Sequence, residues 1–138
     1  MKKIGIFTLV ITALLVSSFA RAYPIGFSAI LGPEAAGATG AGSVMLQFDE
    51  AADTLSIDAT WSGLSGVTTV AHIHCCVAAP GTIGVAVTPG TLPSFPVGVL
   101  AGSYSIELDL SLIGTYTAGF ITNFGGGTVA GAEAALLA

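Results

Sequence analysis

An alternation of apolar and polar residues between positions 54 and 62 constrains the fold of this chain more than any other feature. Every second residue there is apolar, and these residues are Leu55, Ile57, Ala59 and Trp61. Polar residues occupy the positions between them. Because successive side chains of a β-strand point to opposite faces, this spacing predicts a strand with one buried and one solvent-facing side. Trp61 is expected to belong to the core.

The same period of two recurs along the chain and predicts an antiparallel all-β fold. Further strands are expected at residues 25–31, 44–48, 70–77, 84–87, 104–110 and 116–122. The acidic stretch 49–53 lies between two alternating segments and predicts a hairpin turn. Short strands separated by Gly- and Pro-rich turns are typical of a β-sandwich or barrel. An Ala/Leu-rich stretch at 128–138, with Thr128 as a possible N-cap, predicts a short C-terminal helix.

Residues 1–22 are expected to form a secretory signal peptide. Lys2 and Lys3 give a positively charged start, and residues 4–19 are an apolar run without a charge. The Ala-Arg-Ala sequence at 20–22 has the form of a cleavage site. We therefore expect a single domain at residues 23–138 that is secreted, periplasmic or attached to the cell envelope.

Charge excludes several classes of partner once the signal peptide is removed. All three basic residues lie within residues 1–22, so residues 23–138 contain eight acidic residues and no Lys or Arg. The formal charge of this part is then −8 with His neutral. Without cationic side chains to contact phosphates, binding to nucleic acid or to an anionic membrane surface is excluded. We also expect no membrane span after signal removal.

The segment 70–77 contains both histidines and both cysteines of the chain and is the candidate metal site. Read as a strand, it places His72, His74 and Cys76 on one face, at steps of about 7 Å. Imidazole and thiolate are ligands of zinc and copper, so these three residues predict a possible site for either metal. The alternative is that both imidazoles serve a structural hydrogen-bond network.

Cys75 and Cys76 have three possible states. Export favours an oxidising compartment and therefore disulfides. However, adjacent Cα atoms lie about 3.8 Å apart, which is shorter than the usual separation of about 4.4–6.8 Å in a disulfide. A vicinal disulfide, two thiols and a metal-bound or intermolecular form all stay open. A disulfide would remove Cys76 as a thiolate ligand, so the first and third states compete.

Four short motifs occur in an order that resembles the CHRD domain, first described in chordin. They are Gly-Pro-Glu at 32–34, Trp-Ser-Gly-Leu at 61–64, Ala-His-Ile-His at 71–74 and Gly-Ser-Tyr at 102–104. The resemblance covers residues 27–138 and implies a β-sandwich or barrel module without catalytic activity. The family usually closes with further strands and a third histidine, which are missing here. The resemblance therefore implies a chain that continues beyond Ala138, where a bacterial subgroup often carries an envelope-sorting signal.

These observations lead to two functional hypotheses. The first is an exported, non-catalytic CHRD module with a structural or binding role at the cell envelope or outside the cell. Its partner would be a protein or envelope component that the sequence does not identify. The second is a metal-binding or redox protein that uses His72 and His74, with zinc or copper as its only expected cofactor. The sequence contains no nucleophile elbow, P-loop or dinucleotide-binding motif, so no enzymatic activity is expected.

Overall fold

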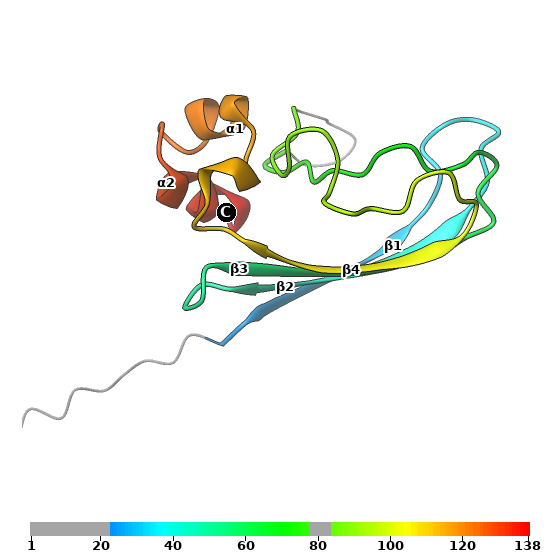
Figure 1. The fold of residues 1–138 in the computed structure, drawn as a ribbon, viewed down its shortest axis with the longest axis horizontal. Helices are drawn as coiled ribbons and strands as arrows, with labels where there is room; N and C mark the ends of the chain where they lie inside the picture. The colour runs from blue at the N-terminus through cyan, green and yellow to red at the C-terminus, as the bar shows by residue number, and fades with distance from the viewer. Residues whose placement is uncertain (1–22, 78–83) are drawn as a thin grey trace, which may run out of the picture.

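A four-stranded antiparallel sheet forms the base of the molecule in the computed structural model, which describes residues 23–77 and 84–138 (Figure 1). The strand order along the sheet equals the order in sequence. The strands are β1 (Ile25–Leu31), β2 (Ala41–Asp49), β3 (Thr54–Ser62) and β4 (Gly102–Asp109). The structure thus confirms the antiparallel all-β class. The predicted signal peptide at 1–22 lies outside the described residues.

The register of the strands gathers the apolar residues on one face of the sheet. Phe48 lies beside Leu55, and Leu55 lies beside Leu108, so three buried residues form one row across β2, β3 and β4. In the last row, Trp61 lies between two glycines, Gly42 and Gly102. The alternation in the sequence therefore predicted the buried face correctly, including Trp61, which is 9% exposed.

The acidic stretch 49–53 forms the predicted hairpin between β2 and β3. A carboxylate oxygen of Asp49 accepts hydrogen bonds from the backbone N–H groups of Ala51 (3.0 Å) and Ala52 (3.1 Å). This Asx-type arrangement explains why an aspartate begins the turn. Asp53 completes the turn in the left-handed region at φ 52°.

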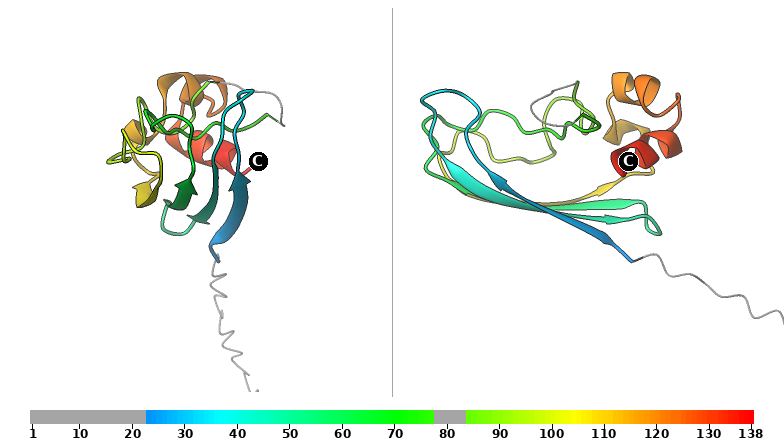
Figure 2. Two further views of the ribbon diagram at one scale, coloured as in Figure 1. Left: turned by 90° about the vertical axis from the view of Figure 1, so that its right-hand side faces the viewer. Right: turned by 180° about the vertical axis from the view of Figure 1, so that it is seen from behind.

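The segment between β3 and β4 covers one end of the sheet, and the C-terminal helices cover the other end (Figures 1 and 2). We call residues 63–77 and 84–101 the cover segment. Its two arms are held together by backbone hydrogen bonds, from Thr68 N to Val99 O (2.9 Å) and from Leu92 N to Ala71 O (2.8 Å) among others. These bonds are too irregular to form a second sheet, so the layer facing the sheet is largely loop.

Three predicted strands are wrong or reduced to single pairs. In residues 70–77 only Ile73 makes a β-bridge, to Val87, and the positive φ of Cys76 (72°) ends the extended backbone. Val87 is also the only bridging residue of the predicted strand 84–87. Tyr116 makes a bridge to Val87, but residues 118–122 of the predicted strand 116–122 are helical. Short apolar runs do not distinguish strand from helix, and these segments find no continuous neighbouring strand.

Short helices follow β4. A 3₁₀ turn, η1 (Ile113–Thr115), precedes α1 (Ala118–Asn123) and α2 (Val129–Leu136). The hydroxyl oxygens of Thr117 and Thr128 accept hydrogen bonds from Phe120 N and Gly131 N and so cap α1 and α2. The predicted C-terminal helix with Thr128 as its N-cap is confirmed. Within the ranges 23–77 and 84–138, no helix is long and apolar enough to cross a membrane.

Candidate functional site

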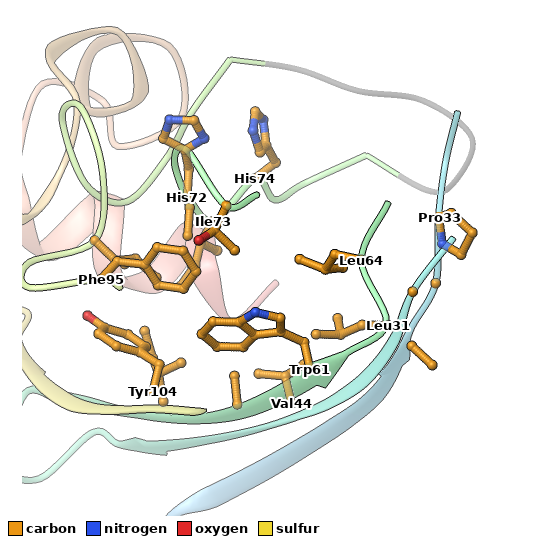
Figure 3. A pocket seen from close by; sticks show the side chains of 18 of the residues that line it. Leu31, Pro33, Val44, Trp61, Leu64, His72, Ile73, His74, Phe95 and Tyr104 are labelled. Carbon is orange, nitrogen blue, oxygen red and sulfur yellow. The ribbon is translucent and has the colours of Figure 1, made fainter. Parts of the chain in front are cut away.

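A cavity of about 460 Å³ lies between the sheet and the cover segment (Figure 3). It is about three times as large as an apolar cavity of about 150 Å³ that is known to bind benzene. Its wall is mainly apolar and combines residues of the four strands and of the loop between β1 and β2 with residues of the cover segment. Its main wall residues are Val44, Trp61, Leu64, Ile73, Phe95 and Tyr104.

Three aromatic rings form a continuous cluster along this cavity. The rings of Trp61 and Phe95 are stacked with their centroids 5.2 Å apart, and Phe95 meets Tyr104 edge-to-face at 5.3 Å. The Tyr104 hydroxyl donates a hydrogen bond to Pro93 O (2.8 Å). Burial also raises the pKa of this hydroxyl, so it stays protonated as a donor. The Phe95 ring thus lies between Trp61 of β3 and Tyr104 of β4, and this packing links the cover segment to the sheet.

Gly102 provides the space that the Trp61 ring needs. A Cβ atom at position 102 would lie 2.8 Å from Cζ2 of Trp61, which is closer than side chains tolerate. The indole can therefore lie across β4 only because the neighbouring strand carries a glycine there. The Gly-Ser-Tyr motif at 102–104 thus has a packing reason: its glycine admits the indole, and its tyrosine extends the aromatic cluster.

The indole nitrogen of Trp61 has no hydrogen-bond partner among the described residues and is closed off from solvent. In Figure 3 it lies on the edge of the ring that faces away from the sheet, on the side of Ile73. Buried N–H groups without an acceptor are rare in folded proteins, because losing water without a replacement bond costs free energy. This atom therefore requires an explanation.

The histidines lie on the outer side of the cover segment. His72 and His74 contribute to the cavity wall, but their rings extend away from the sheet in Figure 3. The rings meet edge-to-face with centroids 5.8 Å apart. The residues that alternate with the histidines, Ala71, Ile73 and Cys75, pack against the core. The alternation therefore predicted the direction of these side chains correctly, although the segment is not a strand. The two imidazoles are therefore neighbours.

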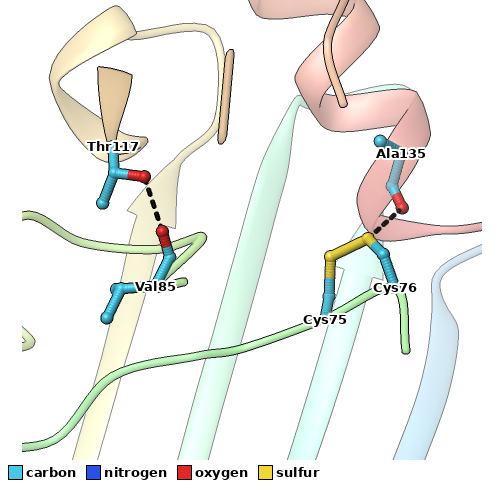
Figure 4. The surroundings of a disulfide bond; sticks show 5 residues. All are labelled: Cys75, Cys76, Val85, Thr117 and Ala135. Atoms are coloured by element: carbon cyan, nitrogen blue, oxygen red, sulfur yellow. Dashed lines mark hydrogen bonds between the residues drawn. A yellow bond between two sulfur atoms is a disulfide. The ribbon is translucent and has the colours of Figure 1, made fainter. Parts of the chain in front are cut away.

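Cys75 and Cys76 form a vicinal disulfide, one of the three predicted states (Figure 4). Sγ of Cys76 lies 3.2 Å from the carbonyl oxygen of Ala135 in α2. A disulfide sulfur carries no hydrogen, so this is a contact and not a hydrogen bond. In this oxidised form the sulfur of Cys76 is not a thiolate. A metal at the predicted set of His72, His74 and Cys76 would depend on the two imidazoles and on reduction or a further ligand.

The disulfide and a second anchor tie the cover segment to the helices. On the other arm of the cover segment, the Thr117 hydroxyl donates a hydrogen bond to Val85 O (Figure 4). Cys76 meets α2, whereas Val85 meets the start of α1. Both arms of the cover segment are thus attached to the C-terminal helices.

Glu133 of α2 and Asp53 form a separate acidic pair away from the cavity. Burial, and next the negative charge of Asp53, raise the pKa of the Glu133 carboxyl above its ordinary value. Neither residue lines the cavity. In the described ranges, no group of three or more His, Cys, Asp or Glu side chains is arranged to hold a metal ion.

The cavity was not predicted from the sequence. Trp61 was correctly predicted to belong to the core, but the stretch around Phe95, which is rich in Gly, Pro and Thr, has no regular apolar spacing. The one usable signal was the pair of glycines facing Trp61 across the sheet, which becomes visible only when the register is known. The predicted histidines lie at the outer edge of the same site.

A sequence model of the CHRD domain matches residues 27–121, more than half of the chain. The match includes β1 from Phe27 onward, β2 to β4, the cover segment and α1 up to Ile121. No curated protein and no solved structure matches the chain. CHRD domains are small binding-type modules that are not known for enzymatic activity. From the order of its motifs, its antiparallel sheet and this match, we conclude that the chain belongs to the CHRD domain family.

Proposed function

We propose that this CHRD domain is a non-catalytic binding module that acts outside the cytoplasm and holds a small apolar ligand in the cavity. The observation that carries the proposal is the cavity itself, an apolar space of about 460 Å³ with an aromatic wall. Ligand sites are typically mostly apolar spaces of about 300–1,000 Å³ with few polar groups. The segment at 1–22, with its positive start and apolar run, supports export.

Apolar burial is the source of affinity in such a site. Removing apolar surface from water yields about 25 cal/mol per Å², and it does so without a charged contact. The aromatic rings are held in place by stacking and by the bond from Tyr104 to Pro93, so little ordering is needed on binding. The module is therefore expected to bind an apolar compound without a large rearrangement of the sheet.

Binding of N-phenyl-1-naphthylamine, a neutral dye that fluoresces in apolar surroundings, tests this proposal. We expect the full chain to bind it with one saturable site. Ala59→Met places a larger side chain in the cavity wall and is expected to weaken binding at least about fivefold, because filled space excludes the dye. Fluorescence titration of both proteins measures the effect.

Ser105→Met is the matched control. Ser105 is exposed and lies beside Asp58, on the face of the sheet opposite to Ala59. The Ser105→Met substitution adds a similar side-chain volume outside the cavity and should leave binding of the dye unchanged. If Ala59→Met and Ser105→Met bind the dye equally well, or if the unaltered chain does not bind it, the proposed site is wrong.

A metal-binding role for His72 and His74 is the second candidate, and the proximity of their rings favours it. Native mass spectrometry of the full chain, expressed with its own N-terminal segment and recovered after export, tests the role with zinc and with copper. A stoichiometric adduct that disappears in the His72→Ala/His74→Ala variant would establish the site. The absence of an adduct in the unaltered chain would exclude it. The same spectrum tests export, because removal of residues 1–22 predicts a chain that begins at Tyr23.

A further inference from the structure

We infer that the ligand of the cavity is an uncharged, largely apolar compound with a hydrogen-bond acceptor, such as a ketone or an ether, that binds the Nε1–H of Trp61. This inference rests on the proposed function and specifies the class of ligand. It follows from the hydrogen bonding of the cavity wall, from the charge of the domain and from the size of the cavity.

The wall of the cavity holds four side chains that can donate a hydrogen bond from a hydroxyl or an indole, and three of them are already satisfied. Thr39 donates to Gly63 O (2.9 Å), Thr68 to Pro96 O (2.7 Å) and Tyr104 to Pro93 O. Nε1 of Trp61 has no acceptor among the described residues. Among these four side chains, Trp61 is thus the one with a donor to offer a ligand; the imidazoles of His72 and His74 also belong to the wall, but they lie at its outer edge.

Solvent does not satisfy this donor. Trp61 is 9% exposed and its Nε1 is closed off from solvent, so bulk water does not replace the missing bond. The side chains around it are apolar: Leu64, Ile73 and Phe95 share the same cavity. A ligand that brings an acceptor to the edge of the indole ring recovers the bond when a neighbouring side chain moves aside to admit it.

Charge selects an uncharged acceptor over a carboxylate. Residues 23–138 contain eight acidic residues and no Lys or Arg. A carboxylate at the edge of the indole ring would therefore lose its water without a Lys or Arg partner, inside a domain of net negative charge, and the imidazoles of His72 and His74 extend away from this part of the cavity. A cationic group is also unsuited to the indole N–H, because it cannot accept the hydrogen bond.

Size gives the approximate extent of the compound. A cavity about three times as large as one that holds benzene has space for two aromatic rings joined by a short link. Benzophenone has this form and carries a neutral carbonyl. Diphenylmethane has the same two rings without the acceptor, and 4-benzoylbenzoate adds a carboxylate to the ketone.

The experiment compares these three probes on the full chain and on Trp61→Phe, which keeps an aromatic ring but removes the N–H. We expect benzophenone to bind about fivefold more tightly than diphenylmethane, the gain typical of a neutral hydrogen bond. In Trp61→Phe the ratio of the two affinities should fall to about one, because the smaller ring alters the apolar contacts of both probes alike. The carboxylate of 4-benzoylbenzoate should weaken binding at least about tenfold relative to benzophenone.

Nuclear magnetic resonance gives a readout that does not depend on affinity. Trp61 is the only tryptophan, so the indole N–H of the ¹⁵N-labelled chain gives a single resonance. Benzophenone should move it downfield, as an accepted hydrogen bond does, and diphenylmethane should not.

Failure of the inference is distinguishable from failure of the proposed function. Equal affinities for benzophenone and diphenylmethane, with no downfield shift, would overturn the role of the N–H while leaving the cavity as a binding site. Tight binding of 4-benzoylbenzoate would overturn the requirement for an uncharged ligand. If neither uncharged probe binds while N-phenyl-1-naphthylamine does, the ligand class is wrong. If the dye fails as well, the proposed function falls.

Discussion

Replacing Phe48 by alanine is expected to lower the free energy of unfolding by about 3–5 kcal/mol. Phe48 is 2% exposed and lies between Ile25 and Leu55 in the sheet. Removing its ring forfeits apolar burial and leaves a cavity that the paired strands around it cannot close. Urea denaturation of the full chain, followed by circular dichroism, measures the change.

Ile30→Ala is the control for this substitution. Ile30 lies in β1 and is 85% exposed, so its loss should change the free energy of unfolding by no more than about 0.5 kcal/mol. A loss below about 1 kcal/mol for Phe48→Ala would show that the core is not centred on the rows of the sheet described here.

Replacing Gly131 by alanine is the second change with a large expected effect, a loss of about 1–3 kcal/mol. A Cβ atom there would overlap the carbonyl oxygen of Gly125 and lie 2.8 Å from Oγ1 of Thr128. Thr128 Oγ1 is the cap of α2 and accepts a hydrogen bond from Gly131 N, so the clash also disturbs the start of the helix. Thermal unfolding measures the loss.

Gly119 in α1 is the matched control, because a Cβ atom there meets nothing within 4 Å. Alanine is a better helix former than glycine by about 1 kcal/mol, so Gly119→Ala should leave stability unchanged or raise it. The two substitutions are chemically identical and both lie in short helices. Equal effects on the midpoint of unfolding would contradict the close contact between Gly125 and α2.

The strands could be predicted from the sequence where one face is buried by a continuous sheet. Around Leu55 and Trp61, alternation reported the real geometry because both neighbouring strands pair along their whole length. Around Ile73 the same alternation persists, with His72 and His74 turned outward, but pairing is limited to a single bridge. The pattern there predicted the facing of the side chains and not the secondary structure.

The cavity could not be predicted, because it depends on distances across the fold. Trp61 and Phe95 are separated by 33 intervening residues and meet only through the path of the cover segment. That path is fixed by irregular hydrogen bonds such as the one from Gly98 N to Thr68 O (2.7 Å), which no local pattern encodes. Likewise, the vicinal disulfide was one option among several, since adjacency alone does not determine the state of Cys75 and Cys76.

Energy transfer from Trp61 to bound N-phenyl-1-naphthylamine tests the central claim most directly. Trp61 is the only tryptophan and lines the cavity, so a dye held there must lie close to it. We predict saturable transfer at one dye per chain, which Ala59→Met weakens and Ser105→Met does not. Binding of the dye without transfer from Trp61, or transfer that Ala59→Met leaves unchanged, would place the ligand elsewhere and contradict the account.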